Sequence, residues 1–189
     1  MTVPATEAQP AHRPDRRAGL LIPVIAGTGL AVGLGVFGRL HDPAGYGLNL
    51  AGFSTGLAAK AWLTTAAGLL ALVQVVTAAG MWGRLGLGDR TWVAPVHRWA
   101  GRLAVLACLP VAVHCLYALG FQSATPRALV HSLLGCLFFG AFSTKMLALR
   151  RPGLPGWALP LVGGLVFTAL VGLWLTSALW FFTTFGVVR

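Results

Sequence analysis

Histidine is the residue type with the most chemical potential in the apolar part of this chain. Of the five histidines, His97, His114 and His131 fall in long apolar stretches, whereas His12 and His41 lie in polar segments. Ionisable side chains are costly inside a lipid bilayer, so those that occur there usually mark a functional site. Because a neutral imidazole binds transition metals and haem iron, these three histidines are the candidate ligands of a redox or metal centre.

Two of these histidines lie at similar depth in consecutive apolar stretches. His114 lies six residues before Gly120, which places it about 9 Å from the end of its predicted helix. His131 lies four residues after Arg127, about 6 Å from the start of the next helix. The short connection 121–127 predicts that the two helices are antiparallel neighbours, and imidazoles at one level on such helices can ligate one iron from opposite sides. The spacing therefore predicts a haem b with His114 and His131 as the ligands of its metal.

Two residues near His131 favour a haem over a bare metal ion. Gly135 lies one turn deeper on the same helix face, and its missing side chain would let a flat porphyrin approach the helix. Arg127 lies one turn toward water, where its guanidinium can pair with a haem propionate. We therefore include Gly135 and Arg127 in the predicted cofactor site.

The three cysteines offer a different chemistry. Cys108, Cys115 and Cys136 lie in apolar stretches and form no CxxC pair, which favours a role as small buried residues. Cys115 and Cys136 could join the two histidines in a zinc or copper site. However, adjacent helical residues project about 100° apart, so His114 and Cys115 cannot easily face one ion.

His97 occupies a separate position in the same predicted helix as His114. It opens the motif HRWAGR, with Gly101 one turn further on, and lies about 25 Å along the helix from His114. The two cannot share one iron. A second haem at His97 would need another ligand at that depth, for which Met146 is the candidate. Otherwise His97 anchors the helix at the membrane interface or donates a hydrogen bond to a quinone.

Five apolar segments must position these residues. Hydrophobic residues make up 57% of the 189 residues and charged residues only 10%, which excludes a soluble domain. A bilayer core of about 30 Å takes about 20 residues of helix. The sequence predicts an all-α integral membrane bundle of five transmembrane helices, at about residues 18–38, 58–82, 96–120, 128–149 and 157–182.

The distribution of charge predicts the orientation and the partners. With the amino terminus inside, most of the 14 lysines and arginines fall on the inner side, as in other short cytoplasmic loops. The net charge of +10 is scattered between the spans, which excludes nucleic acid and indicates a lipid bilayer with an anionic inner leaflet. The outer side keeps only Arg39, Lys60, Arg127 and Arg189.

The remaining segments lie outside the spans. Residues 1–17 are expected to form a disordered basic cytoplasmic tail, and residues 18–189 the domain of a multi-pass protein of the cell inner (plasma) membrane. The outer connection 39–57, which contains His41, is long and rich in glycine, and the sequence assigns it no role. All four carboxylates, Glu7, Asp15, Asp42 and Asp89, also lie outside the spans, which counts against a proton-coupled transporter.

Three stretches carry a resemblance to known families: HRWAGRLAVLACLPVAVHCLYALGF, RALVHSLLGCLFFGAFSTK and LPGWALPLVGGLVFTALVGLWLTSALWFF. From about residue 58 to residue 182 the chain resembles an uncharacterised family of actinobacterial five-helix integral membrane proteins. The HRWxGR motif with a later histidine is remotely similar to the transmembrane haem domains of the cytochrome b561 and ferric reductase families. That similarity implies that His97 and His114 are ligands on one helix and His131 a ligand on the next, in a pair of haems that passes electrons across the bilayer.

The chain departs from that two-haem pattern in two ways. The separation of 17 residues between His97 and His114 is longer than in ferric reductases, and the fourth histidine is missing. The sequence therefore predicts a b-type haem membrane protein for electron transfer, or a small oxidoreductase subunit, served by a quinone or a redox partner protein. The alternatives are a cofactor-free structural or assembly subunit of a complex, or a homo-oligomer, and lastly a transporter or channel.

Overall fold

A computed structural model describes residues 18–46, 52–87 and 90–188 of the chain. The predicted cytoplasmic tail at 1–17 lies outside the described residues. The long helices are α1 (Ala18–Leu40), α2 (Gly56–Met81), α3 (Val93–His114), α4 (Pro126–Ala148) and α5 (Ala158–Trp174). A π-helical turn, η1 (Cys115–Leu119), continues α3, while α5 continues through a second π-helical turn, η2 (Leu175–Leu179), into α6 (Trp180–Phe185).

Five helical segments are long and apolar enough to cross a membrane. They are Gly19–Leu40, Gly56–Met81, Val93–Leu119, Pro126–Ala148 and Ala158–Phe185. This result confirms the prediction of an all-α membrane protein with five spans. Each observed span begins or ends within a few residues of the predicted one.

Threonine caps fix the starts of the two helices that begin near the candidate site. The Thr55 hydroxyl accepts a hydrogen bond from the Ala58 amide at 3.1 Å, so α2 begins slightly before the apolar run. The Thr125 hydroxyl accepts one from the Ala128 amide at 3.2 Å, and Pro126 occupies the first turn of α4. These caps satisfy amides that have no partner within the helix.

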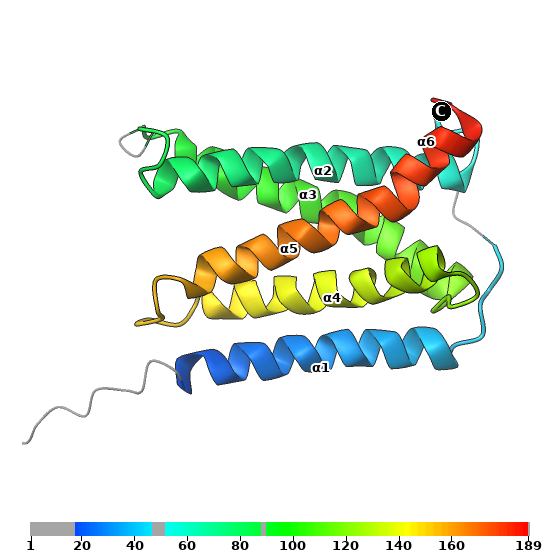
Figure 1. Ribbon diagram of the computed structural model, residues 1–189, viewed down its shortest axis with the longest axis horizontal. Helices are drawn as coiled ribbons and strands as arrows, with labels where there is room; N and C mark the ends of the chain where they lie inside the picture. Colours follow the sequence, from blue (N-terminus) through cyan, green and yellow to red (C-terminus); the bar gives the residue numbers. More distant parts are fainter. Residues whose placement is uncertain (1–17, 47–51, 88–89, 189) are drawn as a thin grey trace, which may run out of the picture.

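The most extensive helix pair, α1 with α4, is not consecutive in the sequence, whereas α2 with α3 and α4 with α5 are. The close pairs are α1 with α4 and α2 with α3, while α5 packs on α4 and contacts α2. In Figure 1, α5 runs obliquely across the bundle between the α2–α3 pair and the α4–α1 pair. In the described part of the chain α3 does not pack along α4, although only a short connection joins them. The expected close pairing of these two helices is therefore not found, although Cys108 of α3 and Phe138 of α4 meet in the core of the bundle.

The interface between α1 and α4 depends on glycine. A Cβ added to Gly140 would lie 2.6 Å from the Gly27 carbonyl oxygen and 2.8 Å from the Ala31 Cβ. The Thr144 hydroxyl, also buried here, donates a hydrogen bond to the Pro23 carbonyl at 3.2 Å. Small residues let helices approach closely in lipid, where packing contacts replace the hydrophobic effect as the source of association.

The centre of the bundle is filled by small and aromatic residues. Cys108 and Phe138 belong to a buried cluster on α2, α3, α4 and α5, together with Ala67, Ala71, Ala169 and Leu170. Cys108 is thus a small buried residue, as its sequence context predicts. Large apolar side chains such as Ile25 and Leu161 are instead 67% and 62% exposed on the outer surface of the bundle, where a membrane protein contacts lipid.

Candidate functional site

A cavity of about 340 Å³ lies at the end of the bundle where α2 and α4 begin. Its walls come from all five spans and from the connection between η1 and α4. The volume falls in the range of about 300–1,000 Å³ that is typical of small-molecule and cofactor sites. A smaller cavity of about 80 Å³ shares His131, Gly135 and Cys115 with the first and reaches Cys108 in the core. The two cavities together extend from the end of the bundle toward its centre.

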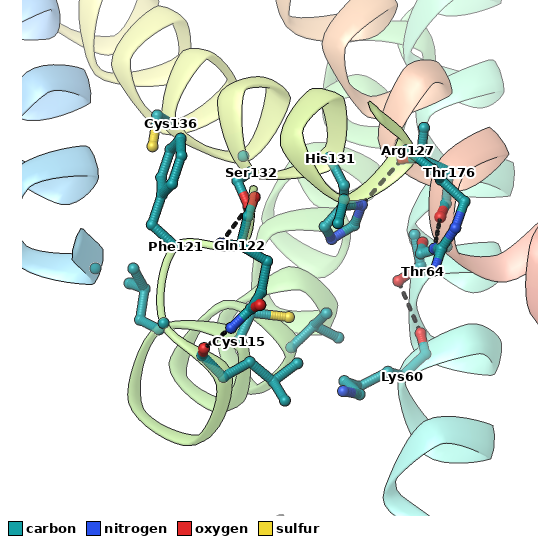
Figure 2. A pocket seen from close by; sticks show the side chains of 18 of the residues that line it. Lys60, Thr64, Cys115, Phe121, Gln122, Arg127, His131, Ser132, Cys136 and Thr176 are labelled. Atoms are coloured by element: carbon teal, nitrogen blue, oxygen red, sulfur yellow. Dashed lines mark hydrogen bonds between the residues drawn. The ribbon is translucent and has the colours of Figure 1, made fainter. Parts of the chain in front are cut away.

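His131 lies on the wall of both cavities, half-buried on α4. Its Nδ1 lies 2.9 Å from the Thr176 hydroxyl oxygen, an interaction drawn in Figure 2. The Thr176 hydroxyl donates its single hydrogen to the Gly172 carbonyl at 2.7 Å, so it can only accept from the imidazole. This network assigns the proton to Nδ1 and leaves the lone pair of Nε2 available to bind a metal.

Gly135 and Arg127 line the same cavity. A Cβ added to Gly135 would meet no atom within 4 Å, so the cavity is open beside this face of α4. The Arg127 guanidinium donates a hydrogen bond to the Thr176 carbonyl at 2.7 Å and lies 4.0 Å from the centre of the Trp180 ring. The structure therefore brings three of the predicted site residues together around one space.

His114 lies elsewhere. It is buried at 9% exposure on α3, but it is not among the residues that line either cavity. The next residue, Cys115, lines both. Six helical residues separate His114 from the cavity-lining Cys108, which turns the two side chains about 120° apart around α3. The predicted pair of opposing imidazoles is therefore not formed around this cavity.

His97 lies at the opposite end of the bundle, where a similar threonine holds it. Its Nδ1 is 2.9 Å from the Thr77 hydroxyl oxygen, which donates to the Val73 carbonyl at 2.6 Å. The Gln74 side-chain amide donates to the His97 carbonyl. A Cβ added to Gly101 would lie 3.1 Å from the Gln74 side-chain oxygen. Gln74 thus fills the space beside Gly101, in contrast to the open space beside Gly135.

Met146, the candidate second ligand with His97, is 39% exposed on α4. Because α4 does not pack along α3 in the described part of the chain, these two residues belong to separate helix pairs. In the same described part, no three His, Cys, Asp or Glu side chains gather as a metal site requires. Cys115 and Cys136 both line the larger cavity with His131.

Lys60 and Thr176 are among the polar residues of the cavity that the sequence pattern did not single out. Lys60 lies one turn into α2, and Thr176 lies in η2. The sequence could have marked Lys60 as a candidate site residue, because a lysine inside a predicted span is costly in lipid. Nothing in the sequence marked Thr176, because threonine is common in membrane helices and its partner His131 is 45 residues away in the sequence.

A model of a family of unknown function, DUF6529, matches residues 20–189. No curated protein matches the chain, and no solved structure matches it. The family match includes every residue that lines the two cavities. The chemistry of the cavity must therefore be inferred from its own side chains.

Proposed function

This chain belongs to the family of unknown function DUF6529, and from its cavity we propose that it is a b-type haem protein of the membrane that takes part in electron transfer. The observation that carries this proposal is the hydrogen bonding of the two ring nitrogens of His131. Its Nδ1 proton is held by Thr176, and its Nε2 is left with a lone pair beside a mainly apolar cavity. Histidines that ligate metals are usually held through their other ring nitrogen in this way.

The residues present fit a haem in three respects. His131 would supply a nitrogen to bind the iron, and the open space beside Gly135 would let the porphyrin approach α4. Arg127 would lie close enough to the cavity to pair with a propionate. A bound haem would supply one-electron chemistry, whereas the protein would bind it, orient it and exclude water. Because His114 is outside the cavity, the geometry supports one histidine ligand, with Cys115 also on the wall.

An absorption spectrum tests the proposal directly. We expect protein purified in detergent to be red, with a Soret band that shifts and an α band that sharpens on reduction with dithionite. The haem type is identified by extraction into alkaline pyridine. Protein that stays colourless after expression with added haem precursor, while retaining its helical circular dichroism, would remove the basis for this function.

A colourless protein would favour the second candidate, a cofactor-free assembly subunit or homo-oligomer. One observation supports it: a Cβ added to Gly163 or Gly164 on α5 would meet no atom within 4 Å. Gly172 on the same helix is already packed, since an added Cβ would lie 2.6 Å from the Leu134 side chain. Two unpacked glycines are suited to the close approach of another helix. Cross-linking between cysteines placed on α5 would detect such a partner.

We also propose that the amino terminus lies in the cytoplasm and that the cavity opens toward the outer side of the plasma membrane. The support is the excess of basic residues in the connections on the opposite side of the bundle. A fluorescent protein fused after Arg189 should then be dark and an alkaline phosphatase at the same place active. The reverse pattern would turn the cavity toward the cytoplasm, with a cytoplasmic redox partner.

A further inference from the structure

Lys60 is a cation placed inside a membrane span, on the wall of the cavity. It lies four residues after the start of α2 at Gly56, which is about 6 Å into the helix. Figure 2 shows its side chain extending from α2 toward the side of the cavity that carries Cys115, below His131. Lysines near helix ends commonly extend toward water. This one instead lines the cavity.

The described walls of the cavity offer Lys60 no opposite charge. Its lining includes Arg127 and His131 but no carboxylate. Asp42 is the only carboxylate side chain within the described ranges, and it does not line the cavity. Among the described residues, no hydrogen bond or ion pair engages the Lys60 ammonium group, whereas Arg127 is held by Thr176 and Trp180.

A cation within a membrane-embedded protein is normally paired or placed where it serves function. Here every described wall of the site is neutral or positively charged, so a ligand could supply the anion that pairs with Lys60. We propose that Lys60 is the counter-cation for a carboxylate of the ligand. The site would thereby select amphiphiles with an apolar body and carboxylate groups over their neutral analogues. This inference rests on the proposed function in one respect. If the ligand is a haem, its apolar body is the porphyrin and its carboxylates are the propionates.

Metal-free protoporphyrin IX and its dimethyl ester test this inference without iron. The two share the apolar body and differ in the carboxylates. We would titrate each into detergent-purified wild-type protein and into K60M, and follow porphyrin fluorescence. We expect wild type to bind the diacid at least about tenfold more tightly than the ester, and K60M to lose most of that preference. The charge-retaining K60R should keep part of it.

K145M is the matched control, because it removes the chain's other lysine, which is half-buried on α4 away from the cavity. It should bind both porphyrins as wild type does. Equal wild-type affinities for diacid and ester, or equal losses for both in K60M, would overturn the role of Lys60. If iron haem shows no spectrum dependent on His131 while the diacid still binds through Lys60, the proposed function fails and this inference stands. Failure of wild type to bind any porphyrin overturns both.

Discussion

We expect the replacement of His131 with alanine to abolish the haem absorption bands of the purified protein, and the replacement of His114 with alanine to leave them in place. His131 lines both cavities and has a free Nε2, while His114 lines neither. Loss of residues that merely position a ligand usually costs about 10- to 100-fold in metal affinity. Removing the ligand itself should therefore cost more than about 100-fold. Haem content per protein, measured as the pyridine haemochrome, gives the comparison.

The threonine beside His131 allows a finer comparison. Thr176→Val keeps the shape of the side chain but removes the acceptor for the Nδ1 proton, so the imidazole is no longer held in one tautomer. We expect about 10- to 100-fold weaker haem binding and a lower Soret absorbance per protein. Thr77→Val makes the same change beside His97 and should leave haem content unaltered. A protein that loses haem with His114→Ala but keeps it with His131→Ala would locate the haem outside this cavity.

Replacing Gly140 with alanine destabilises the protein, although alanine is the better helix former. The added Cβ would lie within 2.6 Å of the Gly27 carbonyl oxygen and 2.8 Å of the Ala31 Cβ. Backbone cannot yield as a flexible side chain can, so α1 and α4 must move apart. Overpacking of this kind typically costs about 1–3 kcal/mol. The free energy of unfolding, followed by circular dichroism during SDS titration in mixed micelles, should fall by that amount.

Gly33→Ala provides the control for this substitution. Gly33 lies on the exposed face of α1, where an added Cβ would meet no atom within 4 Å. Alanine there gains helix propensity of up to about 1 kcal/mol without steric cost. The two substitutions should thus shift the unfolding free energy in opposite directions. If Gly140→Ala were neutral or stabilising, the close α1–α4 contact would not exist in the folded protein.

The sequence alone predicted which candidate residues share one face of α4. Arg127, His131 and Gly135 are four residues apart, and the periodicity of a helix places such residues on one side whatever the rest of the fold does. All three line the cavity. The five spans could also be predicted from the sequence, because in lipid each apolar segment must form a helix to satisfy its own backbone amides. Both results depend on local geometry alone.

The identity of the facing residues depended on tertiary structure. A short connection between α3 and α4 suggested that His114 faces His131, but α3 packs on α2 and α4 packs on α1. The rotation of α3 within that pairing turns Cys115 toward the cavity in place of His114. Thr176 and Lys60 reach the same space from η2 and α2. Helix pairing in lipid is decided by small residues and close packing between helices far apart in the chain, which loop length does not encode.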